Sequence, residues 1–408
     1  MVTRRSLPLL APLALVACGL SPVAQPTGGV DAGDAGAGCP QALVVVDSDY
    51  SSTNVSVVSP SGSVLSASIL SSGSVPPGLS AALSGDVVAP QVRPPSGRLV
   101  LLDRTNAAVV WVDPATAKVE SQLSVATGFA SNPHDYLEVA PGKAYVTRYA
   151  TNAAPGKQPF DGGGDLLILD TDAFTVTGRI ALAAAGDGAL QPRADRMLLV
   201  GSQAWVSLER LSADYSMAGD EHLVVVDPAT DSLAFTLDLP DAENCGGLAL
   251  SPSGSVVAVA CSGVLGATTS STVDSTVILL DATKSPPVEL QRFPVAVTLG
   301  APVGPALAFA SETSLVGFVY GDMTVMRNDV VFSLDTATGA VTKLLDAGAA
   351  FVLGDVRCFP GCGGECAMAD AHANALDLWQ VSGTTFAKLA PVSPDQAVGL
   401  PPRGLGEF

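Results

Sequence analysis

The chain is poor in basic residues, histidines and aromatic residues. Its 408 residues include 20 Lys and Arg against 39 Asp and Glu, which gives a formal charge of −19, and only three residues are histidine. Phosphate backbones and anionic lipid surfaces would repel a protein with this negative charge, so nucleic acid is not an expected partner. No long window repeats apolar residues every 3.6 positions, which argues against long helices.

The residues that dominate instead are Ala, Val, Ser, Gly and Pro. This composition favours short strands joined by many turns, and therefore an all-β fold. A chain of this length exceeds one ordinary hydrophobic core, so either several domains or one repeat architecture is required. The sequence favours the repeat.

A short hairpin with an aspartate at its turn recurs along the chain. It is clearest at Val109 to Leu123 (VVWVDPATAKVESQL), and the marker aspartates are spaced 54 to 57 residues apart: Asp113, Asp170, Asp227, Asp281 and Asp335. A looser copy has Ser59 at this position, and a degenerate copy spans Leu378 to Phe386. We interpret the marker side chains as turn caps, because Asp accepts hydrogen bonds from the backbone of the next residues.

Each marker hairpin follows another hairpin, as at Leu248 to Cys261 (LALSPSGSVVAVAC). Two hairpins make four antiparallel strands, which is the size of a propeller blade. The sequence therefore predicts a seven-bladed β-propeller. The first ordered segment, Ala42 to Asp47, corresponds to the second strand of a blade, so we expect Gly399 to Phe408 to supply the missing inner strand and close the ring.

One segment carries a family resemblance. Ala144 to Asn152 (AYVTRYATN), followed by Asp165 to Ile180, resembles the repeat of the YVTN/YncE-like propeller family. The resemblance implies a propeller fold over most of Ala42 to Phe408, and its short motifs imply no particular activity.

The amino terminus has the pattern of an export signal. Arg4 and Arg5 precede an apolar run that ends in Leu15 to Cys18 (LVAC), which resembles a bacterial lipobox. We expect a signal peptide over residues 1–17, lipid on Cys18, a flexible Gly/Ala/Pro tether over residues 18–38 and a single propeller domain over residues 39–408. Gly19 favours the outer membrane, and an ordinary secretory peptide is the alternative.

The six other cysteines are expected to form disulfides, since an exported chain meets an oxidising environment. Symmetric spacing about hairpin turns predicts the pairs Cys245–Cys261 and Cys358–Cys366. Cys39 enters blade one just before its second strand, on the face where the neighbouring blade seven displays its turn, so we expect it to pair with Cys362. A metal site at Cys358, Cys362 and Cys366 is the alternative.

The propeller topology places short turns on one face and long loops on the other. The long loops are Arg148 to Asp165, Leu208 to Glu221, Ser262 to Ser275 and Tyr320 to Asp329, and such loops commonly carry function. All three histidines, including His222, map to this face, with charged residues such as Arg196 and Glu209. The candidate ligand-binding residues are His134, Asp135, Arg148, Arg193, Asp195, Arg210, Asp322, Arg327, Asp370, His372 and Arg403.

Three functions fit these features. The leading hypothesis is a lipid-anchored envelope protein that binds a protein, glycan or small ligand through its long-loop face. The alternatives are a lactonase-like propeller hydrolase with an axial site, and a structural scaffold. No G-x-S-x-G nucleophile motif is present. We expect no cofactor, although loop acids such as Asp161 and Asp165 could hold Ca²⁺.

Overall fold

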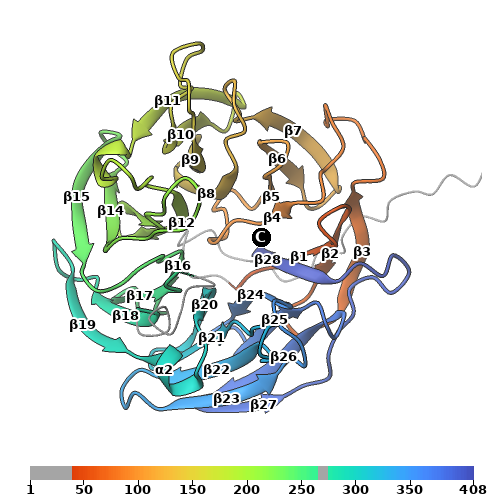
Figure 1. The fold of residues 1–408 in the computed structure, drawn as a ribbon. Helices are drawn as coiled ribbons and strands as arrows, with labels where there is room; N and C mark the ends of the chain where they lie inside the picture. The colour runs from red at the N-terminus through yellow and green to blue at the C-terminus, as the bar shows by residue number, and fades with distance from the viewer. Residues whose placement is uncertain (1–38, 265–273) are drawn as a thin grey trace, which may run out of the picture.

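Seven sheets of four antiparallel strands surround a central axis, as the sequence predicts (Figure 1). The structure, a computed structural model, describes residues 39–264 and 274–408. The predicted signal peptide, tether and lipidated Cys18 lie outside these residues. No helix in the described part of the chain has the length and apolar character needed to cross a membrane.

The strands of each blade are given from the axis outward. Those of blades one to four are β28 (Pro402–Glu407), β1 (Leu43–Ser48), β2 (Thr53–Val58) and β3 (Val64–Ser71); β4 (Val87–Val88), β5 (Leu99–Asp103), β6 (Ala108–Asp113) and β7 (Lys118–Ser124); β8 (Pro133–Ala140), β9 (Lys143–Thr151), β10 (Gly163–Asp170) and β11 (Thr175–Ala181); β12 (Ala194–Val200), β13 (Gln203–Leu208), β14 (Glu221–Asp227) and β15 (Ser232–Leu239).

The strands of blades five to seven follow the same order. They are β16 (Gly247–Leu250), β17 (Val256–Cys261), β18 (Thr276–Asp281) and β19 (Val288–Phe293); β20 (Val303–Ser311), β21 (Ser314–Val319), β22 (Val330–Asp335) and β23 (Val341–Asp346); β24 (Leu353–Cys358), β25 (Glu365–Asp370), β26 (Ala375–Ser382) and β27 (Thr385–Lys388). The helical elements are the 3-10 turn η1 (Ala183–Ala185) and the short helix α2 (Val295–Leu299).

Burial explains why the middle strands are almost uniformly apolar. Every residue of β1 and β2 is buried, because a blade packs against a neighbour on both of its faces. The outer strand β7 alternates exposed and partly buried residues, since it borders solvent. The core therefore consists of layers between adjacent blades, such as the cluster that joins Val44 to Leu101 and Val112.

The marker aspartates cap their turns, as predicted. Oδ1 of Asp113 accepts a hydrogen bond from the amide of Ala115 at 2.9 Å, and its Oδ2 accepts one from the Thr116 hydroxyl at 2.8 Å. Asp335 accepts from the amides of Ala337 and Thr338 in the same way. The Thr116 hydrogen bond, helped by the Ala115 amide, lowers the pKa of Asp113 below its usual value. These carboxylates stabilise the scaffold.

The carboxyl terminus closes the ring. Strand β28 pairs antiparallel with β1, with Leu43 opposite Glu407 and Val45 opposite Leu405. The amide of Gln41 donates to the carbonyl oxygen of Phe408 at 2.9 Å. Blade one is therefore built from both ends of the described chain, which confirms the predicted closure.

Three disulfides join the six cysteines in the predicted pairs. Cys245–Cys261 and Cys358–Cys366 each bridge the two strands of an inner hairpin region, with Cα atoms 3.8 and 4.0 Å apart. Cys39–Cys362 ties the start of the described chain to the β24–β25 turn of blade seven, with Cα atoms 5.4 Å apart. Because all three sulfurs of the hypothetical Cys358, Cys362 and Cys366 metal site are in disulfides, that alternative is wrong.

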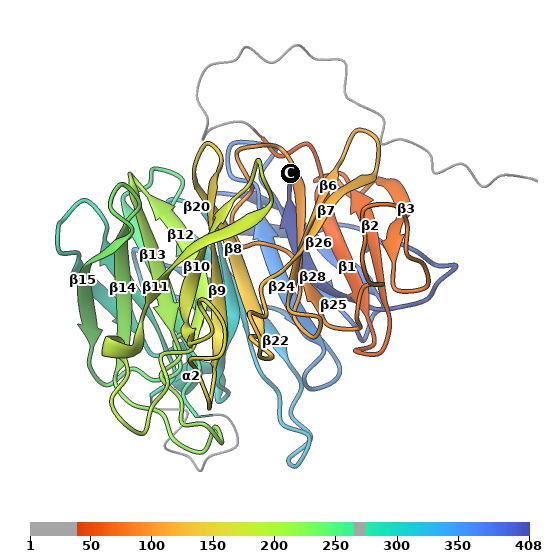
Figure 2. The ribbon, with the colours of Figure 1, turned by 90° about the horizontal axis from the view of Figure 1, so that it is seen from above.

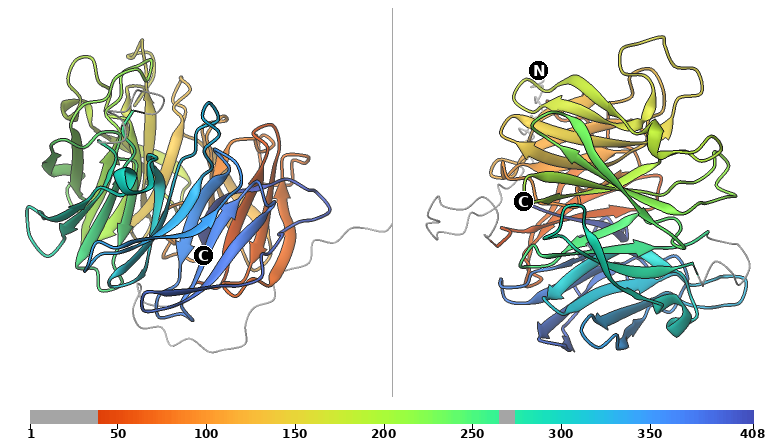
Figure 3. Two further views of the ribbon diagram at one scale, coloured as in Figure 1. Left: turned by 60° about the horizontal axis from the view of Figure 1, so that its bottom comes forward. Right: turned by 90° about the vertical axis from the view of Figure 1, so that its left-hand side faces the viewer.

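The two faces of the ring differ as expected from the topology. The loops between second and third strands, and those between blades, lie on one face, which we call the long-loop face. The opposite, short-turn face carries the hairpin turns, Cys39 and the C-terminal Phe408. Figure 2 shows the C-terminus at one face and α2 at the other, with the light-blue β21–β22 loop projecting beside it, and Figure 3 shows the same ring in two further views.

Candidate functional site

An axial pocket opens on the long-loop face, where the inner strands of several blades begin. Its volume is about 270 Å³, and its lining includes Asp86, Arg104, Arg196, Tyr320, Asp355 and Arg403. Three arginines thus meet two carboxylates in a protein with a formal charge of −19. A concave site with this charge balance suits an anionic group.

The three arginines differ in how far they are neutralised. Arg104 forms an ion pair with Asp86, with its Nε 2.8 Å from Asp86 Oδ1. Arg403 donates to the carbonyl oxygen of Phe351 at 3.2 Å and its guanidinium lies 5.1 Å from the ring centre of Tyr50. Among the described residues, Nε of Arg403 and Nη1 of Arg196 are buried and have no hydrogen-bond partner. These two groups can donate to a ligand.

Arg196 keeps its charge because acids surround it. Burial alone would lower the pKa of its guanidinium, but Asp195, Asp355 and Asp135 outweigh burial and raise the pKa above its usual value. The Arg196 backbone is fixed by the Ser207 hydroxyl, which accepts from its amide at 3.0 Å. The same hydroxyl donates to the carbonyl oxygen of Gly246 at 2.8 Å. Arg196 is therefore a permanently charged group on a rigid inner strand.

Asp135 connects three blades behind the pocket. Its Oδ1 accepts from the amides of Gln91 and Tyr136, at 2.8 and 2.9 Å, and its Oδ2 accepts from the amide of Met197 at 2.7 Å. Burial raises the pKa of Asp135 to about 6 in spite of these donors and the charge of Arg196. Its position between blades two, three and four makes it a structural link.

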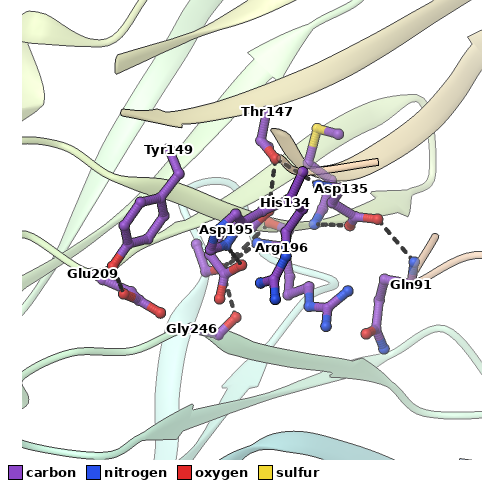
Figure 4. A network of polar contacts seen from close by, with 12 residues as sticks. Gln91, His134, Asp135, Thr147, Tyr149, Asp195, Arg196, Glu209 and Gly246 are labelled. Carbon is purple, nitrogen blue, oxygen red and sulfur yellow. Dashed lines mark hydrogen bonds and ion pairs between the residues drawn. The ribbon is translucent and has the colours of Figure 1, made fainter. Parts of the chain in front are cut away.

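A hydrogen-bonded network of acids lies next to Arg196 (Figure 4). Nδ1 of His134, on β8, is 2.7 Å from Oδ1 of Asp195, on β12. The side chains of Asp195 and Glu209 both lie against Gly246, and the hydroxyl of Tyr149 donates to Glu209 Oε2. The network links the inner strands of blades three and four to the β13–β14 loop.

The two carboxyl groups of this network have opposite pKa shifts. Burial and the nearby charge of Asp195 raise the pKa of Glu209 well above its usual value. Burial opposes ionisation of Asp195 too, but His134 and Arg196 outweigh it, so the pKa of Asp195 lies below its usual value. Of these two carboxyl groups, Glu209 is therefore the one that keeps its proton to the higher pH.

His134 belongs to a stack of flat side chains. Its ring lies 4.1 Å from that of Tyr149, with 11° between the planes. The Arg193 guanidinium lies on the other side, 4.9 Å from the ring centre of Tyr149 and 4.0 Å from that of Tyr215. Carbonyl oxygens of the β13–β14 loop hold Arg193, including that of Ser212 at 2.8 Å. The stack forms one wall of a second pocket.

That second pocket, the tyrosine pocket, adjoins the axial pocket. Its volume is about 250 Å³, and its lining includes Tyr149, Glu209, Tyr215, Asn244, Pro305 and Tyr320. Pro305 and Tyr320 line both pockets. His134 and Asp195 line neither of these two pockets, so they support the walls from behind.

Several predicted site residues converge on this region. His134, Asp135, Arg193 and Asp195 lie in or behind the walls described above, and Arg403 lines the axial pocket. Arg196 and Glu209, which the sequence also places on this face, line the axial and tyrosine pockets respectively. The mapping of these residues to one face agrees with the structure.

Other predicted site residues have local partners elsewhere. Arg148 is fully buried and pairs with Asp165, Nε to Oδ1, at 2.7 Å. Arg210 pairs with Asp187 at 3.0 Å.

The remaining candidates lie in the loops of blades six and seven. Asp322 and Arg327 pair through their backbones in the β21–β22 loop, and Asp370 caps its own turn by accepting from the amide of His372 at 2.8 Å. The structure therefore does not bring them to the axial pocket.

The loop acids considered for Ca²⁺ are also engaged. Asp161 accepts hydrogen bonds from the amides of Gly156, Lys157 and Gln158, and Asp165 pairs with Arg148 and Arg179. Within residues 39–264 and 274–408, no group of three or more His, Cys, Asp or Glu is placed to hold a metal ion.

Residues that sequence reasoning missed also shape the two pockets, among them Asp86, Arg104, Tyr149, Asn244, Tyr320 and Asp355. Tyr149 lies within the AYVTRYATN motif, and Tyr320 begins a long loop already assigned to the working face. An aromatic residue at the end of the second strand of a blade is the signal that could have identified Tyr149 and Tyr320. Nothing in the sequence distinguishes Asn244.

Exposed apolar side chains also gather on the long-loop face. Tyr50 and Phe351 stand at the mouth of the axial pocket, with 63% and 45% of their surface exposed. Others occupy the β13–β14 and β21–β22 loops: Tyr215, Met217, Met323, Val325 and Met326. Exposed apolar groups of this kind are typical of binding surfaces.

The fold is similar to that of several solved structures. A putative 6-phosphogluconolactonase from Bacteroides uniformis aligns with a TM-score of 0.55 and 12% identity over 90% of this chain and 99% of that chain. A putative 6-phosphogluconolactonase from Bacteroides fragilis gives 0.52 and 11% over 90% and 97%. Hydrazine synthase of Kuenenia stuttgartiensis gives 0.52 and 13% over 78% and 90%. No family model and no curated protein matches the chain.

Proposed function

We propose that this protein is a binding propeller that takes up a small anionic ligand in its axial pocket. The observation that carries the proposal is the pair of guanidinium groups, on Arg196 and Arg403, whose buried N–H groups have no partner among the described residues. A buried donor without an acceptor costs free energy, and a carboxylate or phosphate oxygen supplies the missing acceptor.

The charge of the rest of the molecule supports selectivity. The formal charge of −19 repels anions from most of the surface. The axial pocket is an exception, since its lining holds three arginines and two aspartates. Arg196 lies on the inner strand β12, and the charges of Asp195, Asp355 and Asp135 favour its charged form, so the pocket presents a charged donor to a ligand.

The test is a calorimetric titration with acetate and with inorganic phosphate as separate probes at low ionic strength. Arg196→Gln removes one charged donor, worth roughly 1.5–3 kcal/mol, so affinity for the better probe should fall about 10- to 100-fold. Arg292→Gln is the matched control, because Arg292 pairs with Glu289 on the exposed outer strand β19. Equal affinities of the two variants would overturn the proposal.

The location of the protein is part of the proposal. The LVAC sequence at Leu15 to Cys18 supports export and lipid attachment, and the three disulfides are compatible with export. Cys39, which begins the described chain, lies on the short-turn face, opposite the axial pocket. Labelling with radioactive palmitate, with Cys18→Ser as the control, tests the anchor: an unlabelled wild-type protein would contradict it.

Hydrolysis is the second candidate. Glu209 lines the tyrosine pocket, and burial raises its pKa, which favours the protonated form that a general acid requires. Two similar folds belong to proteins described as putative 6-phosphogluconolactonases. If this candidate is right, the protein should open a sugar lactone and Glu209→Gln should abolish turnover without loss of acetate binding. An inactive wild-type protein leaves binding as the function.

A further inference from the structure

The tyrosine pocket contains an acceptor that the described residues leave unused. Asn244 donates its Nδ2 to the carbonyl oxygen of Gly263 at 2.9 Å, which fixes the orientation of the amide. Its Oδ1 is buried and has no hydrogen-bond partner within the described chain. An unused buried acceptor in a pocket wall indicates a ligand that brings a donor.

The remaining wall combines flat ring surfaces and aliphatic side chains with the polar side chains of Ser262 and Glu209. Tyr215, Pro305 and Tyr320 contribute ring surfaces, and Leu211 adds an aliphatic side chain. The hydroxyl of Tyr149 is already engaged with Glu209. A flat aromatic ring matches the ring surfaces of Tyr215, Pro305 and Tyr320.

The axial pocket and the tyrosine pocket share part of their wall. Pro305 and Tyr320 line both, so a ligand that lies across Tyr320 can reach the axial pocket with one end and the tyrosine pocket with the other. Tyr320 comes from the end of β21, and Phe318 packs edge-on against it with ring centres 5.2 Å apart. This contact holds the shared wall in place.

Building on the proposed axial anion site, we infer that the ligand has two parts: an anionic group at Arg196 and Arg403, and an aromatic ring bearing a hydroxyl or amine donor that lies in the tyrosine pocket and donates to Asn244 Oδ1. Aryl carboxylates with a ring hydroxyl are the simplest compounds of this class. The ring adds affinity through apolar burial and the hydroxyl adds specificity.

The test compares three probes by calorimetry: acetate, phenylacetate and 4-hydroxyphenylacetate. Phenylacetate should bind at least about tenfold more tightly than acetate, because the ring leaves water for an apolar pocket. The hydroxyl should add about fivefold more through one neutral hydrogen bond. Asn244→Gly should remove the hydroxyl increment and leave the phenylacetate affinity close to that of the wild type.

Glycine is the suitable replacement because Asn244 has a positive φ of 56°, which glycine adopts without strain. The matched control is Asn374→Gly, since Asn374 has a φ of 51° and lies in blade seven outside both pockets. The hydroxyl increment is the ratio of the affinities for 4-hydroxyphenylacetate and phenylacetate, measured on the same variant. A loss of stability that weakens both probes equally therefore leaves this ratio unchanged. An unchanged increment in Asn244→Gly overturns the inference.

The same titrations distinguish a failure of the ring subsite from a failure of the axial anion site. If all three probes bind with equal affinity and Arg196→Gln weakens each of them, the anion site stands and the ring subsite is wrong. If the two aryl probes bind but Arg196→Gln changes neither, the ring subsite stands and the anion site is wrong. Tighter binding of glucuronate than of 4-hydroxyphenylacetate would contradict the aromatic class.

Discussion

Nδ1 of His134 and Oδ1 of Asp195 lie 2.7 Å apart and join the inner strands of blades three and four. Burial lowers the pKa of His134 even though the charge of Asp195 opposes this shift. His134 is therefore neutral at pH 7. Because Asp195 is an anionic acceptor, the imidazole proton is on Nδ1 and Nε2 is unprotonated.

This relationship predicts a single tautomer. Nitrogen-15 NMR of the imidazole at pH 7 should show a protonated Nδ1 and a bare Nε2, and the ring should gain its second proton only below its ordinary pKa of about 6.5. His222 also pairs with an aspartate, the exposed Asp238, so its imidazole signals serve as a comparison in the same spectrum. A His134 that carries both protons at pH 7 would contradict the assigned network.

Asp47 should make stability depend on pH. Burial raises its pKa from 3.8 to about 7, although hydrogen bonds from Ser56 and Asn54 oppose this shift. A carboxyl group with a raised folded-state pKa stabilises the fold when protonated, so the free energy of unfolding should fall as the pH rises from about 4 to about 7. The shift corresponds to at most about 4 kcal/mol.

Asp47→Asn keeps a neutral acceptor at this position, so the variant should lose the part of the pH dependence that Asp47 contributes, while Asp135 and Glu209, whose pKa values are also raised, keep theirs. Urea unfolding between pH 4 and pH 8 measures it. Asp172→Asn, at the β10–β11 turn, changes an acid on the short-turn face and should retain the wild-type slope. Parallel pH profiles for the wild type and Asp47→Asn would show that Asp47 is ionised in the folded protein.

Ring closure by β28 should dominate stability. Leu405 is fully buried and Phe408 is 3% exposed, so Leu405→Ala should cost roughly 2–5 kcal/mol in unfolding free energy. Val398 precedes the strand and is 49% exposed, so Val398→Ala is a control with an expected change below about 0.5 kcal/mol. Removal of residues 398–408 should abolish cooperative folding, and a truncated chain with an unchanged unfolding midpoint would refute the closure.

The Cys39–Cys362 disulfide should contribute more than the other two. It spans 323 residues, whereas Cys245–Cys261 spans 16, and a longer loop restricts the unfolded chain more strongly. Replacing Cys39 and Cys362 with alanine should lower the unfolding free energy by about 2–4 kcal/mol. An effect no larger than that of Cys245 and Cys261 to alanine would mean that β28 alone fixes the ends.

The sequence predicts the scaffold well because the scaffold is repeated. Asp113 and its equivalents recur at nearly constant spacing, and each caps a turn in the structure. The missing inner strand of blade one could be inferred from Ala42 to Asp47 and from the C-terminal segment. Hairpin symmetry identified Cys245–Cys261 and Cys358–Cys366. These features depend on local spacing, which a single sequence contains.

The site is less predictable because it depends on radial position within the ring. The topology places both Arg148 and Arg196 on the long-loop face, yet Arg148 is buried against Asp165 while Arg196 lines the axial pocket. Arg148 lies on β9, the second strand of its blade, whereas Arg196 lies on β12, an inner strand. Asn244 gains its role only from the packing of blades three to six around the tyrosine pocket, and no local pattern indicates it.

The most direct test of the central claim is a crystal structure of the protein with 4-bromophenylacetate, in which the anomalous signal of bromine locates the ring. The account predicts a carboxylate oxygen within about 3.2 Å of Arg196 Nη1 and the bromine in the tyrosine pocket. A bound probe whose carboxylate lies elsewhere, with Arg196 untouched, would contradict the assignment of the axial pocket as the anion site.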